Sequence, residues 1–490
     1  MPNMTVFMAA MRCEWRILRL DPALWLVLAM ILATVVYALH NGKNLLEQRA
    51  AAVAASMTEE QGRLTDLRKN IADFESGKTA PPERPFRDPR NAIFVGGGSA
   101  ATIAALPAQP LAITAVGQSD LYPPTLRVST GSKDSFLFSD EIANPAHLFA
   151  GTFDLAFVLI FIYPLWILAL TYNLISGERE QGTLALTASC PVQLRTVLVG
   201  KLMVRAGLPM LFTLATVFAG LTFIGNGSSV AGGALLVLAL AIVIYGVFWA
   251  VLAAAVNGLG SDSAYNALML VGAWIAVLLI VPSLTNATAE ALYPSPSRAE
   301  MVLGVRAASV SADKERDAAL ARYEEEHSHA SGEDSHEEVL TRGSSRERTL
   351  RRLAVQQAAT ARAEEVLAVH EAQLQRQHDL AERLAYISPA LLLNDALAEI
   401  AGTGRSRYDE FFAQIDRFHR EWREFFVTKA QAERMLTSDD YQRFPRFAFI
   451  ENPDIGTGDR IAAALIGIAI PLLLLAGLAA RGLRRCRVAG

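Results

Sequence analysis

Three histidines stand among carboxylates in one polar stretch past the middle of the chain, and this pattern comes closest to a metal site. Imidazole and carboxylate groups together can bind Zn²⁺ or Cu²⁺. A closed zinc site needs four ligands at a fixed spacing, however, and this stretch lacks such spacing. We therefore favour a solvated acidic turn over a metal site. The histidines are His327, His329 and His336.

A phosphate loop of the form G-x-x-x-x-G-K-[ST] would allow nucleotide binding, and the sequence does not contain one. Lys43, Lys78 and Lys201 each follow a glycine but lack the upstream glycine and the Ser or Thr. The run Gly96–Ser99 has no following lysine, so we interpret it as a turn. Because no catalytic triad, zinc motif or paired carboxylates emerge, we expect neither enzyme chemistry nor a cofactor in this chain.

The hydrophobic residues, 52% of 490, gather in six runs that are long enough to cross a bilayer as helices. The fourth and fifth runs contain no Asp, Glu, Lys, Arg or His, which buried helices of soluble proteins seldom achieve. The predicted spans are residues 23–39, 153–175, 203–224, 231–256, 264–284 and 461–480.

Basic residues near the span ends predict the orientation, because cytoplasmic loops carry an excess of Lys and Arg. They cluster in residues 1–22, in the loop 176–202 and in the tail 481–490. With six spans these three segments lie on one side, so we expect both termini in the cytoplasm. Segments 40–152 and 285–460 then lie outside. The net charge of −4 gives no nucleic-acid signature.

The first outer segment begins with a predicted helix that carries a heptad seam. Apolar residues recur at spacings of four and three from Leu46 to Phe74, with Glu60 as one polar seam position. About 30 helical residues would project about 45 Å at 1.5 Å per residue. The Gly- and Pro-bounded stretches 91–107 and 110–129 predict short strands or irregular structure.

The second outer segment predicts a helical hairpin with helices at about 298–327 and 345–386. The helix that follows has an aromatic face, which is more typical of packing than of ligand binding. We expect both outer segments to pack into one extended, largely helical, coiled-coil domain with a few short strands, so the fold class is mainly α. The aromatic face comprises Phe411, Ile415, Phe418, Trp422 and Phe425.

Two short segments are expected at the inner membrane surface. Residues 1–22 predict an amphipathic helix that ends at Asp21-Pro22, with a plain tail as the alternative. The loop 176–202 predicts a short helix with Thr183 as a candidate N-cap and Pro191 as its end. Such a helix either inserts into a groove of a soluble partner or is an ordinary interfacial helix, and the residues alone do not decide.

The loop sequence GEREQGTLALTASCPVQLRTVLVGKL closely resembles a loop in the membrane subunits of ABC-2 type transporters. The shared pattern is an acidic–Arg–acidic triplet, Gly-Thr, a short apolar stretch, a proline, a basic residue and Gly-Lys-Leu. The six spans and the surface helix also resemble that family, and the large outer segments resemble those of a bacterial subgroup. The matching positions are Glu178, Arg179, Glu180, Gly182, Thr183, Leu184, Pro191, Arg195, Gly200 and Lys201.

The resemblance implies a permease subunit of the bacterial inner membrane that exports amphipathic cargo. Its implied partners are a pair of ATPase subunits, which bind ATP and Mg²⁺, and a second permease, identical or related. The implied ATPase-coupling positions are those of the pattern from Glu178 to Arg195. Two alternatives stay open: movement transmitted to a periplasmic or outer-membrane partner without cargo passage, and a membrane anchor or sensor.

Polar and aromatic residues of the second span are the candidate lining of a pathway. Ionisable residues are few in the spans, and Asp154 and Arg205 lie near span ends, where snorkelling is cheap. A mildly polar pathway suits amphipathic cargo better than a small ion. The candidate pathway residues are Tyr163, Trp166, Tyr172 and Asn173.

Overall fold

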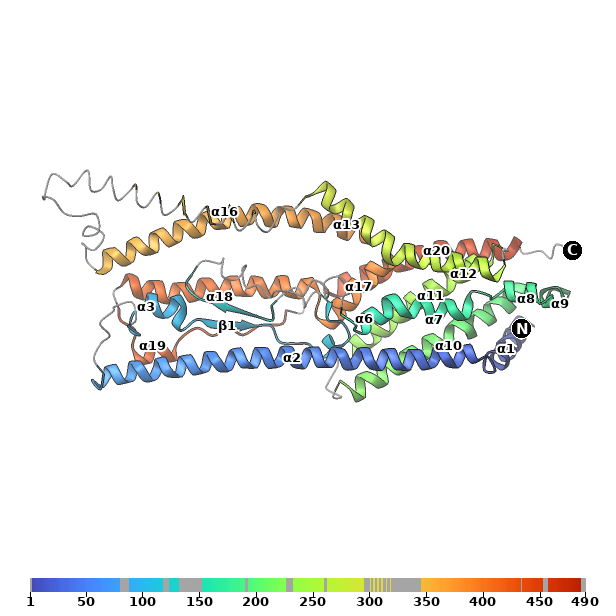
Figure 1. The fold of residues 1–490 in the computed structure, drawn as a ribbon, viewed down its shortest axis with the longest axis horizontal. Coiled ribbons are helices and arrows are strands. Elements are labelled where there is room, and N and C mark those ends of the chain that lie inside the picture. Colours follow the sequence, from blue (N-terminus) through green and yellow to red (C-terminus); the bar gives the residue numbers. More distant parts are fainter. Residues whose placement is uncertain are drawn as a thin grey trace.

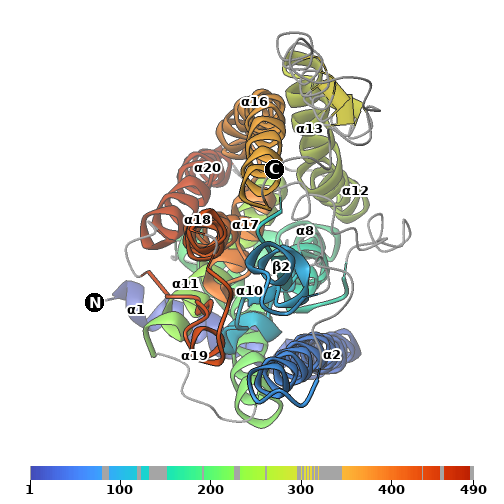
Figure 2. The same cartoon turned by 90° about the vertical axis from the view of Figure 1, so that its left-hand side faces the viewer.

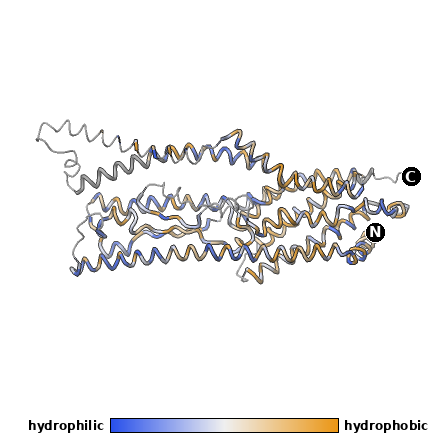
Figure 3. Tube along the Cα trace, in the orientation of Figure 1, coloured by the Kyte–Doolittle hydropathy of each residue, from blue (hydrophilic) through white to orange (hydrophobic). Residues whose placement is uncertain are grey.

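A computed structural model describes most of the chain, and the molecule is elongated (Figure 1). Apolar helices form a bundle at one end of the molecule. A more polar domain, which we call the projecting domain, forms the other end, as the hydropathy colouring in Figure 3 shows. The described residues are 2–79, 88–117, 123–131, 152–189, 193–225, 232–259, 262–294, 345–432, 434–452 and 457–485, with scattered positions between 300 and 318.

Within the described residues, six helices are long and apolar enough to cross a membrane, which confirms the prediction of six such helices in a mainly helical chain. The C-terminal half of α16 (Ser345–Ala385) and α17 (Pro389–Ala401) pass the same test only as a pair, bent by 116°. The elements of the six helices are α2 (Pro22–Glu75), α6 (Leu155–Phe157) with η5 (Val158–Ile162), α7 (Tyr163–Thr171) and α8 (Ser176–Glu180), α10 (Leu194–Phe223), α11 (Gly232–Asn257), α12 (Ser263–Ile275) with η6 (Ala276–Ile280) and α13 (Val281–Leu292), and α20 (Thr457–Arg485).

The first span and the predicted seam helix are one continuous helix, α2. The preceding helix α1 (Pro2–Leu18) ends just before Asp21, whose carboxylate accepts a hydrogen bond from the Ala23 amide at 2.9 Å. Pro22 takes the first helical position, where its missing N–H costs nothing. The 54 residues of α2 correspond to about 80 Å of helix, so α2 runs from the bundle along the whole projecting domain (Figure 1).

Two tyrosines hold the centre of the bundle together. The Tyr163 hydroxyl donates to the Ile242 carbonyl at 3.2 Å, and the Tyr245 hydroxyl donates to the Ile160 carbonyl at 3.1 Å. Gly246 makes this approach possible, because a Cβ there would lie 2.2 Å from the Tyr163 hydroxyl oxygen. The second span and α11 are thereby locked at close range.

The projecting domain is built around a two-stranded antiparallel sheet that lies between α2 and α18. Thr102 pairs with Val128 in this two-stranded sheet; β1 contacts α2 and β2 contacts α18. The end view in Figure 2 shows α18 and α2 on different sides of this sheet. The elements are α3 (Ala92–Phe94), η2 (Val95–Ser99), β1 (Thr102–Ala105), η3 (Pro110–Ile113), β2 (Thr125–Val128), α18 (Arg405–Gln431) and α19 (Ser438–Gln442).

An aromatic core fills the space between these elements. The predicted aromatic face of α18 is buried, except that Phe426 takes the place expected for Phe425, which is only partly buried. The polar seam residue Glu60 accepts hydrogen bonds from the Thr102 hydroxyl at 2.6 Å and the Ile103 amide at 2.9 Å. The seam of α2 therefore faces the two-stranded sheet and aromatic side chains. The coiled coil, in which a second helix would wind around α2, stays a prediction.

Candidate functional site

The loop after the second span folds into two short helices at the end of the bundle farthest from the projecting domain, which we call the loop end. Gly182 separates α8 from α9 (Thr183–Ser189), and its φ of 72° is the left-handed conformation that glycine adopts most easily. Thr183 is the first residue of α9 and does not act as the predicted N-cap. Its hydroxyl instead donates to the Glu178 carbonyl at 3.2 Å. Pro191 lies outside the described residues.

A buried carboxylate of the first helix, Glu14, links this loop to α10. Glu14 is 1% exposed, and its Oε2 lies 3.5 Å from the Lys201 Nζ. The other carboxylate oxygen accepts a hydrogen bond from the Arg205 Nε. Lys201 also donates to Glu178 of α8, so four charged groups join α1, α8 and α10. Arg205 reaches further, because its Nη1 donates to the Asn173 Oδ1 at 2.6 Å.

Gly200 explains how α1 comes close enough to bury Glu14. A Cβ at this position would lie 3.2 Å from the Ala10 Cβ and 3.3 Å from the Phe7 carbonyl oxygen. A side chain at this position would therefore fit only if α1 or α10 moved by a few tenths of an ångström. The Gly-Lys pair that matches the transporter loop thus has two physical roles here: the glycine admits α1, and the lysine pairs with carboxylates of α1 and α8.

A second network of hydrogen bonds holds α8 to the helices α11 and α12. The Glu180 carboxylate accepts a hydrogen bond from the Ser263 amide at 2.6 Å, at the N-terminus of α12, where a negative charge is favoured. The hydroxyls of Ser176 and Ser263 are 2.8 Å apart. Asn257 of α11 accepts from the Ile175 amide at 3.1 Å. The end of the second span is therefore fixed on several sides.

Two residues of the acidic triplet make contacts within the chain, and the role of the triplet in coupling stays a prediction. Glu178 and Glu180 have partners within the chain, so they hold the loop against the bundle. The residues that the loop presents to its surroundings lie instead on and beside α9: Leu186 is 70% exposed, and Arg179 and Arg195 are exposed too. The loop is thus fixed to the bundle through α8, while α9 carries its exposed side chains.

The predicted pathway residues lie at different depths. Tyr163 and Trp166 are enclosed by helices of the same chain, so they serve packing here, and a pathway role for them stays a prediction that requires the bundle to open. Tyr172 is half-buried. Asn173 belongs to the Arg205 contacts at the loop end.

A chamber of about 600 Å³ lies at the opposite end of the spans, where the bundle meets the projecting domain. Apolar side chains such as Phe157 and Phe161 share its lining with Asp395, Arg405 and Arg460. Asp395 belongs to α17, outside the six spans. Burial disfavours its charged form and nearby carboxylates add repulsion, and together they raise the pKa of Asp395 to about 6.

The predicted histidine-rich stretch lies outside the described residues, and with it His327, His329 and His336. Among the residues that the structure does describe, no group of three or more His, Cys, Asp or Glu side chains is placed to hold a metal ion.

Comparison with known proteins gives one match, to a family described as "Domain of unknown function (DUF3526)", over residues 298–450. This region includes α17, α18 and α19, and with them one side of the projecting domain. No curated protein and no solved structure matches the chain.

Proposed function

We propose that this chain is the membrane subunit of an ATP-driven transporter of the ABC-2 type in a bacterial inner membrane. In this proposal the loop end faces the cytoplasm and contacts an ATPase subunit. A second permease, identical or related, completes the pathway. The observation that carries the proposal is the loop itself, because α8 is fixed to α10 and α12 while α9 presents Leu186 to the outside.

The geometry suggests how a push on α9 would reach the spans. Displacing α9 pulls on Gly182 and hence on α8, whose Glu178 is paired with Lys201 of α10. Glu180 passes the same displacement to α12 through the Ser263 amide. Closure of two ATPase subunits on binding ATP would supply the push, since the chain has no phosphate loop of its own.

Amphipathic cargo fits the chamber beside the projecting domain. Its lining combines aromatic side chains with both signs of charge, including Phe161, Asp395 and Arg460. Ligand sites that combine an apolar wall with a few placed polar groups bind molecules of mixed character. The chamber lies at the end of the spans opposite to α9, where an exported molecule would leave the membrane.

A second candidate function is movement of the projecting domain without passage of cargo. It is favoured by α2, which is both the first span and a wall of the projecting domain over 54 residues. A rigid helix of this kind would carry a tilt of the span directly to a partner outside the membrane. Reconstitution in liposomes separates the two functions, because only the first moves a labelled amphiphile across the bilayer.

The proposed ATPase partner is tested by purifying the tagged full-length chain from the membranes of its host in mild detergent. We expect a protein with a G-x-x-x-x-G-K-[ST] loop to co-purify. Leu186→Asp should lower its recovery about tenfold, as loss of an apolar anchor does at interfaces. The matched control is Leu259→Asp, since Leu259 is 67% exposed between α11 and α12 and lies off α9. Equal recovery with both variants would count against the role of α9.

A further inference from the structure

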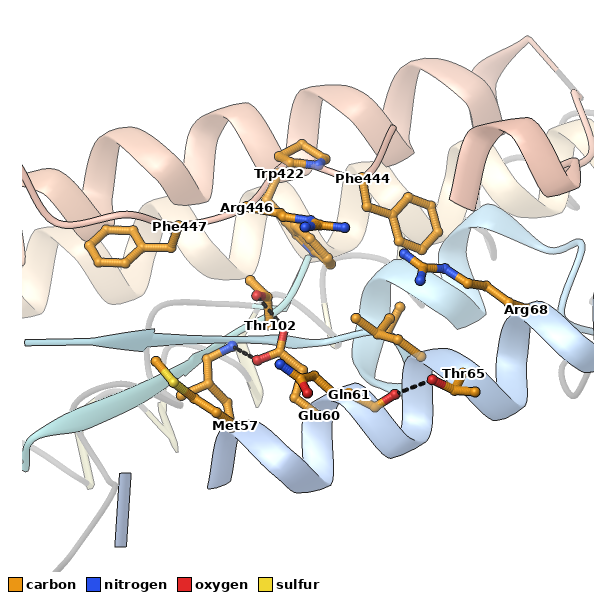
Figure 4. Close-up of a pocket in the computed structure, with 14 residues that line it drawn as sticks. Met57, Glu60, Gln61, Thr65, Arg68, Thr102, Trp422, Phe444, Arg446 and Phe447 are labelled. Atoms are coloured by element: carbon orange, nitrogen blue, oxygen red, sulfur yellow. Dashed lines mark hydrogen bonds between the residues drawn. The ribbon is translucent and has the colours of Figure 1, made fainter. Parts of the chain in front are cut away.

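A pocket of about 450 Å³ opens in the projecting domain, far from the loop end and separate from the chamber (Figure 4). One wall is the face of α2 from Met57 to Arg68, and the floor includes strand β1. The roof is the extended segment 444–447 with Trp422 of α18 behind it. Its volume falls within the range of small-molecule sites.

Aromatic side chains provide an apolar surface in this pocket. Trp422, Phe444 and Phe447 all line it. Trp422 is 1% exposed, and its indole N–H donates to the Gly96 carbonyl at 3.2 Å. The ring is thus fixed in orientation before any ligand arrives. A rigid aromatic wall of this kind accepts a flat or branched apolar group at little entropic cost.

Two guanidinium groups reach into the same space. Figure 4 shows Arg68 extending from α2 and Arg446 from the opposite segment. The Arg68 Nη2 donates to the Tyr441 carbonyl at 3.2 Å, but its Nε is buried and meets no acceptor in the described part of the chain. Arg446 is exposed, and no described carboxylate forms an ion pair with it.

The one acidic residue among the lining residues offsets at most one of these two positive charges. Glu60 already accepts hydrogen bonds from the Thr102 hydroxyl and the Ile103 amide, and it forms no ion pair with either arginine. Two positive charges therefore face one occupied carboxylate. A buried N–H without an acceptor is rare in folded proteins and marks a place where an acceptor is missing.

We propose that this pocket binds a small monocarboxylate whose carboxylate is carried on an aromatic or branched apolar group. The carboxylate would accept from Arg68 and Arg446, since guanidinium groups match the geometry of carboxylates. The apolar group would lie against Trp422 and Phe444. This proposal does not depend on the transporter function, because neither an ATPase nor transport enters the argument.

The test is calorimetric titration of the full-length protein in detergent with indole-3-propionate and, separately, with its uncharged amide. We expect the acid to bind at least about tenfold more tightly than the amide, because a charged hydrogen bond to a carboxylate is lost in the amide. Arg446→Gln should weaken binding of the acid about tenfold. Because Arg446 is exposed, this variant should fold normally, which its unfolding midpoint checks.

The matched control is Arg443→Gln, which removes an exposed arginine of the same segment that does not line the pocket and pairs with Asp439. Its affinity for the acid should stay within about twofold of the wild type. The proposal is overturned if the acid does not bind, if the amide binds as tightly as the acid, or if Arg446→Gln binds the acid like the wild type.

Discussion

The cluster around Glu14 makes a quantitative prediction about how the loop end is held together. Glu14 and Glu178 balance Lys201 and Arg205, and all four side chains are at most 19% exposed. Glu14→Gln leaves one uncompensated positive charge, and Lys201→Met leaves one uncompensated negative charge. Breaking a buried ion pair by removing one partner costs about 3–5 kcal/mol. We expect the lower end, about 3 kcal/mol for each variant, because the remaining charges keep other partners.

The double variant Glu14→Gln/Lys201→Met restores the balance, since Glu178 and Arg205 remain. It should therefore be less destabilised than the sum of the two single variants by at least about 1 kcal/mol, within the range of directly interacting residues. The assay is the free energy of unfolding from reversible titration with SDS, for the wild type and the three variants in one detergent. Additivity within about 0.5 kcal/mol would refute the inference that these charges form one cluster.

Two further predictions concern the bundle and the chamber. Gly246→Ala should destabilise by about 1–3 kcal/mol, because its Cβ would displace the Tyr163 hydroxyl; Gly272→Ala, where a Cβ meets nothing within 4 Å, is the control, and equal unfolding free energies would contradict the packing argument. The pKa of Asp395 is about 6 in the folded state against an ordinary 3.8. Between these values the folded state keeps a proton that the unfolded state has lost, so the free energy of unfolding falls as the pH rises through this range to 6. Asp395→Asn should therefore raise the unfolding midpoint more at pH 8 than at pH 4.5, and a difference independent of pH would contradict this.

Hydropathy was enough to predict the six membrane-length helices, because each one is specified by a local run of apolar residues. The aromatic face of α18 followed from its helical periodicity for the same reason. That reasoning failed at one position, where Phe426 is buried in place of the predicted Phe425. Both residues border the apolar face, and Phe426 is the one that packs between Trp422 and Phe444.

The charged centre of the loop end could not be predicted from local pattern. Glu14 stands among arginines in an amphipathic helix, where a lone acid looks like part of a solvated face. Its partner Arg205 lies 191 residues away in the chain, and no local pattern relates two residues at that separation. Glu60 was predicted as a polar seam position. What explains a carboxylate there is the hydrogen bond that it accepts from the Thr102 hydroxyl, 42 residues further along the chain.

The contacts that the acidic triplet makes within the chain could not be predicted for a related reason. A cluster such as Glu178 and Glu180 beside a membrane span suggests charges offered to a partner, because local sequence does not show what folds back onto them. The Ser263 amide that binds Glu180 comes from another span. The exposed apolar side chain Leu186 is the better candidate for the partner contact.

The proposed contact between α9 and an ATPase subunit can be tested with a photo-crosslinking amino acid placed at Leu186 in the full-length chain in living cells. We predict a crosslinked product that contains a protein with a G-x-x-x-x-G-K-[ST] loop, and a much weaker product from the same amino acid placed at Leu259. A crosslink from Leu186 to periplasmic proteins alone, or no product with an ATPase, would contradict the proposed contact.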